Sequence, residues 1–190
     1  MKRNLIFKLF FYVLGVVITL TAVPIIINAL GVKEFGLISL LNSLLAYLSV
    51  ATMALTSSLG RNLIFSYKDS LLESSKELST VVFSMLILGL TLIPFFLYFS
   101  KSILILVGIE IYYIEDASLI FKFMCGLFII NAISNSIGAT FFLKNRLDFL
   151  SITGFINQVS THLFFLLFLF FTSFGLLSYS YAMGLTSLIL

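Results

Sequence analysis

The sequence predicts an all-α protein, a polytopic transmembrane helical bundle with five full spans and a truncated sixth. Of its 190 residues 61% are hydrophobic and 10% are charged, whereas soluble domains carry roughly 25% charged residues. The mean hydropathy is +1.18, and the apolar residues form six long runs. A helix needs about 20 apolar residues to cross about 30 Å of hydrocarbon. Barrel strands would alternate apolar and polar residues, so continuous runs favour helices.

The six runs make one transmembrane domain, residues 1–190. The first run follows a basic N-terminus, but it is too long for the apolar core of a signal peptide and lacks a clear cleavage site, so we expect it to be retained. The predicted spans are about 9–30, 37–59, 81–99, 117–143, 150–171 and 174–190. The last run, at about 17 residues or roughly 25 Å, is short for a crossing. We therefore expect the chain to be interrupted there.

Two hydrophilic segments separate the spans. Arg61 to Ser79 contains the stretch Asp69 to Leu78 (DSLLESSKEL), which is typical of a short amphipathic helix lying along the membrane interface. Lys101 to Asp116 is too short and too acidic to cross. Pro24 and Pro94 lie within spans, where each predicts a kink of the kind that moving transporters also use.

The positions of Lys and Arg predict the orientation. With the N-terminus inside, eight of these residues lie on the inner side and two on the outer side, while Lys122 lies within the fourth span. The inner eight are Lys2, Arg3, Lys8, Arg61, Lys68, Lys76, Lys144 and Arg146, and the outer two are Lys33 and Lys101. Because positive residues concentrate on the cytoplasmic side, we expect a cytoplasmic N-terminus in the bacterial inner membrane.

The sequence carries no signature of an enzyme. It has no paired carboxylates within a span, no Cys and His cluster at metal spacing and no glycine-rich phosphate loop, so we expect no catalytic residues, no metal and no cofactor. Cys125 is the single cysteine and lies in an apolar run, where it predicts ordinary packing. The basic residues lie beside spans, so nucleic acid is not an expected partner.

Polar residues recur at helical spacing inside three spans. They are Asn42, Ser49, Thr52 and Thr56 in the second span, Asn131 and Asn135 in the fourth, and Gly154, Asn157, Gln158, Thr161 and His162 in the fifth. Such stripes are unfavourable against lipid. Two interpretations stay open for the four Asn residues and Gln158: hydrogen bonds between packed helices, or the lining of a hydrated substrate cavity.

Four ionisable residues lie in or at the ends of spans. Lys122 extends either toward the outer headgroups or into a cationic site for an anionic substrate. Lys8 and Arg61 contact anionic membrane lipid or the substrate. His162 makes an interhelical hydrogen bond, or it couples protons or binds a ligand.

Four segments resemble a known family. They are Leu30 to Leu37 (LGVKEFGL), Thr56 to Arg61 (TSSLGR) at the end of a Ser-rich span, Phe141 to Arg146 (FFLKNR), and the turn at Phe174 to Leu176 (FGL). Their order and spacing resemble the N-terminal region of Wzx-type polysaccharide (O-antigen) flippases, in the multidrug/oligosaccharidyl-lipid/polysaccharide exporter superfamily.

The resemblance implies the N-terminal lobe of an exporter-type fold, which in the whole family has about 12 to 14 helices in two lobes around a central cavity. It implies a transporter that moves undecaprenyl-linked oligosaccharide to the outer leaflet for surface polysaccharide biosynthesis. Lys8, Arg61, Lys122 and His162 would be the residues to test as diphosphate partners. The implied partners are lipid-linked oligosaccharide, a second lobe or another copy, and a polysaccharide polymerase. Two alternatives stay open: a multidrug or lipid II exporter, and a non-transporting fragment that packs against polysaccharide-assembly proteins.

The predicted orientation is tested with reporter fusions. Reporters fused after Asp69 and Arg146 should lie in the cytoplasm, because positive residues hold these loops inside. A reporter fused after Glu110 should lie outside the cytoplasm. Paired alkaline phosphatase and fluorescent-protein reporters measure both sides. The opposite pattern would refute the predicted orientation.

Overall fold

The computed structural model describes residues 2–138, 140–143 and 147–189, and within them every regular element is a helix. The elements are α1 (Lys2–Leu30), α2 (Val32–Asp69), α3 (Leu71–Leu106), the 3-10 turn η1 (Ile111–Tyr113), α4 (Ile114–Gly138), α5 (Thr140–Leu143), α6 (Leu147–Phe171), η2 (Gly175–Leu177) and α7 (Ser178–Ile189). The all-α prediction is confirmed.

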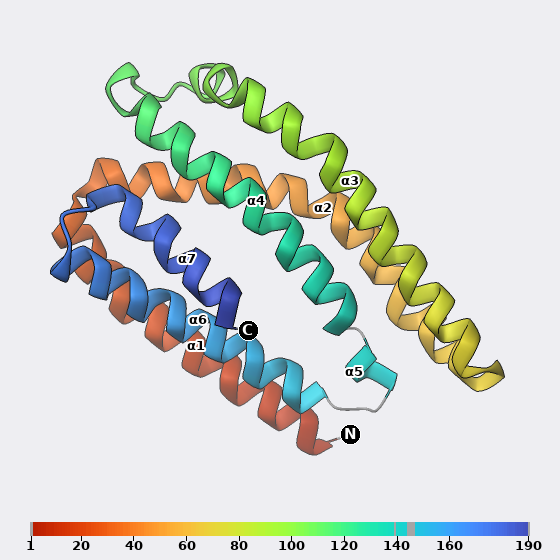
Figure 1. The fold of residues 1–190 in the computed structure, drawn as a ribbon. Coiled ribbons are helices and arrows are strands. Elements are labelled where there is room, and N and C mark those ends of the chain that lie inside the picture. The colour runs from red at the N-terminus through yellow and green to blue at the C-terminus, as the bar shows by residue number, and fades with distance from the viewer. Residues whose placement is uncertain (1, 139, 144–146, 190) are drawn as a thin grey trace.

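The helices form an up-and-down bundle with two distinct ends (Figure 1). At one end, which we call the glycine-turn end, the connections contain Gly31, Gly108 and Gly175, with φ of 96°, 85° and 51°. Only glycine adopts this left-handed region readily. The other end, the N-terminal end, holds the start of α1, the turn at Ser70 and the α4–α6 connection. Toward the N-terminal end the ribbons of α1 and α6 diverge from those of α2 and α3.

The turn between α2 and α3 differs from the sequence prediction. α2 is continuous to Asp69 and α3 begins at Leu71, so residues 69–78 do not form a separate helix along the interface, and that prediction is wrong. The Ser70 side chain caps α3 by accepting a hydrogen bond from the Glu73 backbone N–H at 3.1 Å. Ser followed three positions later by Glu is the sequence pattern of a capping box.

The α2–α3 hairpin is much longer than a bilayer is thick. Its helices have 38 and 36 residues, which at about 1.5 Å per residue gives about 57 and 54 Å, against about 30 Å of hydrocarbon. Near its tip, Leu59 and Leu63 are buried against Leu78 and Val81. Each helix of the hairpin is therefore longer than one crossing requires, and the tip has a small core of its own.

The main apolar core lies in the half of the bundle nearest the glycine turns. Its largest fully buried side chains include Ile26 of α1, Leu41 of α2, and Ile120, Phe121 and Met124 of α4. α7 completes it through Ala182, which is fully buried. The glycine-turn half is therefore closed by side-chain packing.

Four helical segments are long and apolar enough to span a membrane: Ile6–Leu30, Leu71–Leu106, Ile111–Gly138 and Asp148–Phe171. They indicate a multi-pass membrane protein. In three of them at most 17% of the most apolar stretch is buried, as expected where lipid surrounds the bundle, whereas half of that stretch is buried in Ile111–Gly138. α2 is not among these four segments, and α7 has 12 residues. Helix α3 continues through Pro94 and α1 through Pro24.

Two ion pairs connect exposed residues at the glycine-turn end. Lys33 of α2 donates to Glu110 at 3.1 Å, and Lys101 of α3 pairs with Glu115 of α4. The hydrogen bond from Lys33 and the charge of Glu110 raise the pKa of Lys33 above its ordinary value. The pair links the α1–α2 turn to the α3–α4 connection.

Close packing of α3 on α4 depends on Gly89. A Cβ atom there would lie 2.9 Å from Ile129 Cγ2, closer than packed carbons allow. We expect Gly89→Leu to lower the free energy of unfolding by on the order of 1–3 kcal/mol, measured by unfolding in detergent. Gly126→Leu in α4 is the matched control, because no atom lies within 4 Å of its Cβ position. Equal stability of the two variants would contradict this packing.

Candidate substrate-binding cavities

The Asn residues of α4 and α6 meet at a cavity of about 390 Å³, which we call the Asn131 cavity. Asn131 and Asn135 line it from α4, Asn157 lines it from α6, and Ser187 lines it from α7. Ser134 and Thr153 add hydroxyl groups. The cavity interpretation of these three Asn residues is therefore geometrically possible, because their side chains share one space.

A second cavity of about 220 Å³, the Thr52 cavity, lies between α2 and α4. Ser49, Thr52 and Thr56 line it opposite Asn131 and Asn135, which line both cavities. The three hydroxyls donate to carbonyls of their own helix, at 2.7 Å to Ala46 O, 2.9 Å to Ser49 O and 2.9 Å to Thr52 O. Their oxygen lone pairs can still accept, so this side of the cavity offers mainly acceptors.

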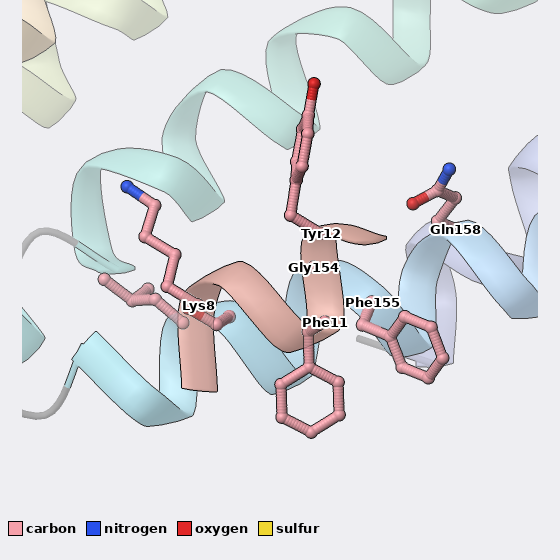
Figure 2. Close-up of a pocket in the computed structure, with 8 residues that line it drawn as sticks. Lys8, Phe11, Tyr12, Gly154, Phe155 and Gln158 are labelled. Carbon is pink, nitrogen blue, oxygen red and sulfur yellow. The ribbon is translucent and has the colours of Figure 1, made fainter. Parts of the chain in front are cut away.

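A third cavity of about 430 Å³, the Lys8 cavity, lies between α1 and α6. Figure 2 shows the Lys8 amine, the Tyr12 hydroxyl and the Gln158 amide extending to one side, toward α4, while the rings of Phe11 and Phe155 extend to the opposite side. Tyr12 is 71% exposed. The cavity thus combines a cation with neutral hydrogen-bonding groups near the N-terminal end.

All three cavities lie toward the N-terminal end, away from the main apolar core. α6 contributes positions 149 to 158 and α4 contributes positions 128 to 138 to their lining. α7 packs on the later part of α6, where the Thr161 hydroxyl donates to the Thr186 hydroxyl at 3.2 Å. The three cavities and the main apolar core therefore lie at different levels along the bundle axis.

Gln158 has a second role in fastening α1 to α6. Its Nε2 donates to Thr19 Oγ1 at 2.8 Å and to Gly15 O at 3.2 Å. Thr19 Oγ1 donates to Gly15 O at 3.0 Å and lies 3.3 Å from His162 Nε2. With its hydrogen on Gly15 O, the Thr19 oxygen accepts from Gln158 and, in the Nε2–H tautomer of His162, from that ring as well, which uses its full capacity. Gly15 permits this approach, because a Cβ there would clash with Gln158 Oε1.

His162 and Asn42 fit the helix-packing interpretation. Besides its contact with Thr19, His162 lines a largely apolar groove of about 370 Å³ between α1 and α6. Asn42 Oδ1 accepts from the Tyr179 hydroxyl of α7 at 3.0 Å, and Asn42 Nδ2 donates to Ile38 O at 3.0 Å. Both residues join helices, and neither is among the residues that line the three polar cavities.

The other two predicted cationic residues differ in what the structure describes of them. The side chain of Arg61 lies outside the described part of the chain. Lys122 is half-buried on α4 and is not among the residues that line the cavities above. It precedes Asn131 by nine residues, or about 14 Å along the helix axis. Of the predicted cations, the structure places Lys8 beside the polar cavities.

Sequence reasoning missed Tyr12, Thr19 and Tyr179. Thr19 follows Gly15 by four positions, and Gln158 precedes His162 by four, so each pair lies on one helix face. Matching the two pairs could have predicted contact of α1 with α6. Tyr12 and Tyr179 are ordinary residues for a span end, and their spacing carries no comparable signal.

The described residues that line the cavities offer hydrogen-bonding groups and one cation, Lys8. Among the residues that the structure describes, no group of three or more His, Cys, Asp and Glu side chains is placed to hold a metal ion. Asn amides both donate and accept, which suits hydroxyl groups of a ligand. Comparisons of the chain with protein-family models, with curated proteins and with solved structures gave no match.

The hydrogen bonds of Thr19 predict a measurable contribution to stability. Thr19→Val keeps the shape but leaves Gln158 and His162 without this partner, so we expect a loss of about 1–2 kcal/mol in the free energy of unfolding in detergent. Thr21→Val is the control, because the Thr21 hydroxyl donates to Val17 O and Ile18 O of its own helix. An equal loss in both variants would show that the cluster does not join α1 to α6.

Proposed function

We propose that this chain is the membrane-embedded lobe of a flippase-type transporter that moves undecaprenyl-linked oligosaccharide across the bacterial cytoplasmic membrane. The observation that supports this most is the confinement of adjoining polar cavities to one half of an apolar bundle. A transporter in one of its access states needs this arrangement, with a site accessible from one side and closed by packing on the other. The resemblance of the sequence to Wzx-type flippases names the substrate class.

The chemistry of the cavities fits an oligosaccharide headgroup. Sugar hydroxyls need partners that donate and accept, which Asn131, Asn135 and Asn157 provide within one cavity. The Lys8 ammonium, in the bordering cavity, suits the phosphate groups that join the sugar to its lipid. The lipid tail would remain in the hydrocarbon along the exposed apolar side chains, so that only the polar part needs the cavities.

The proposed orientation places the cavities on the cytoplasmic side. Connections and helix ends at the N-terminal end carry eight Lys and Arg residues with four acidic residues, and those at the glycine-turn end carry two Lys with four acidic residues. This asymmetry supports a cytoplasmic N-terminal end. Helix α2 is joined to α1 and α3 by single residues at opposite ends. If α1 and α3 both cross the bilayer, α2 must cross it as well and forms a fifth span.

A lobe of this kind is proposed to act with a second lobe or another copy of the chain, because a substrate cavity between two lobes lets each provide one side. Complementation of a strain that lacks its own flippase tests the proposal, with this chain compared with a version completed by a second lobe. Restored surface polysaccharide supports transport. Export of hydrophobic drugs or of lipid II without polysaccharide would favour the other exporters, and failure of both versions would refute transport.

Replacing the three cavity Asn residues by Ala should lower polysaccharide display by the complementing version. Each lost hydrogen bond is worth about 1 kcal/mol, so we expect at least about a tenfold loss for the triple variant. Lys8→Ala should also lower display. Lowered display by Lys122→Ala would support a substrate site at Lys122, and unchanged display would support the headgroup interpretation. Asn28→Ala, outside the cavities, is the control. Full display by the triple variant at normal protein levels would refute the site.

Accessibility to water can be measured without transport. In a Cys125→Ala background, Asn135→Cys and Asn157→Cys should react with a membrane-impermeant maleimide in inside-out vesicles and resist it in right-side-out vesicles. Met124→Cys is the control on the same helix as Asn135; Met124 is 1% exposed, and we expect it to react at least about tenfold more slowly because apolar cores hold no water. Unreactive cavity positions would mean that the Asn residues only pack helices.

A further inference from the structure

The Lys8 cavity and the Asn131 cavity meet at one turn of α6. Leu150 and Gly154 line both cavities and lie four residues apart, on one face of the helix. The Leu150 side chain lies beside α4, since a Cβ at Gly138 would be 3.4 Å from Leu150 Cδ2. Gly154 has no side chain. The two cavities can therefore communicate past Gly154, along a space that we call the Gly154 passage.

Packing does not explain glycine at this position. Gly89 and Gly184 stand where a Cβ would lie 2.9 Å from Ile129 or Phe123, and Gly31 has a positive φ. Around Gly154 no atom lies within 4 Å of the Cβ position, and its φ is not positive. Glycine weakens a helix interior relative to alanine. Helix α6 has room for a larger residue at position 154. The effect of glycine there is therefore to leave this space empty.

Open space alone does not distinguish Gly154. Gly36 and Gly126 also have no atom within 4 Å of the Cβ position. Gly154 differs because it lines two cavities at once, one with the cation Lys8 and one with three Asn side chains. A side chain here would project into the space that joins a cationic region to a neutral polar region.

We propose that the Lys8 cavity and the Asn131 cavity are two subsites of one elongated binding site, and that Gly154 keeps the passage between them open. The ligand is a single molecule with an anionic group, held near Lys8 and Tyr12, and a neutral hydroxyl-bearing group, held by the Asn residues. The chain between the two groups crosses α6 at Gly154. This inference rests on the proposed function and adds the placement of the substrate and the residue that limits its width.

A cross-linking experiment on the full chain tests the passage. In the Cys125→Ala background, Tyr12→Cys and Asn157→Cys place one thiol in each cavity, and a bismaleimide with a short flexible linker joins them within one molecule. Peptide mass spectrometry measures the yield. Gly154→Leu should lower the yield about tenfold or more, because the side chain fills the passage without displacing packed atoms. Gly154→Ala should give a smaller decrease, and the matched control Gly126→Leu should leave the yield unchanged.

Each outcome has one meaning. A monofunctional maleimide should label both cysteines equally well with and without Gly154→Leu, which shows that the variant folds and that each cavity keeps its own access. An unchanged cross-linking yield in Gly154→Leu, or no cross-link in the parent, overturns the two-subsite proposal. Cross-linking needs no transport. A chain whose cross-link depends on Gly154 but which fails in complementation refutes the proposed function alone.

Discussion

The separation of apolar packing from polar lining along the bundle axis is the constraint on which the rest of the structure depends. Near the glycine turns, side chains such as Leu41, Phe121 and Met124 are buried in one core. In a bilayer this contact gains little from the hydrophobic effect, so close packing has to hold the helices together. Toward the N-terminal end the helices diverge and their polar residues face cavities. The same helices thus form a packed end and an end with cavities.

Polar groups join helices both beside the cavities and within the packed core. The cluster of Gly15, Thr19, Gln158 and His162 joins α1 to α6 close to the Lys8 cavity, and Gln158 belongs to both. Asn42 joins α2 to α7 inside the apolar half. Amide side chains therefore form hydrogen bonds between helices in one place and line a cavity in another. The difference lies in whether a neighbouring helix brings a partner within hydrogen-bonding distance.

The sequence alone could predict the helical class, four of the long apolar helices and the existence of polar faces, because these follow from composition and from a period of 3.6 residues. It could not say which face meets which helix. Asn131, Asn135 and Asn157 share a cavity, whereas Asn42 and His162 contact other helices, and this depends on pairings far apart in the chain. The interfacial helix was a wrong prediction because the polar stretch 61–79 is the tip of a hairpin, in which α2 runs to Asp69 and α3 begins at Leu71. The capping-box pattern of Ser70 and Glu73 could have predicted that a helix begins directly after Ser70.

The length of that hairpin has a mechanical consequence. Helix α3 is packed closely on α4 at Gly89, and the Ser70 tip lies 19 residues, or about 29 Å, from that contact. The tip segment therefore acts as a lever arm: a tilt of about 5° at Gly89 moves the tip by about 2.5 Å. A small change of helix angle in the bundle is thereby amplified at the end of the hairpin.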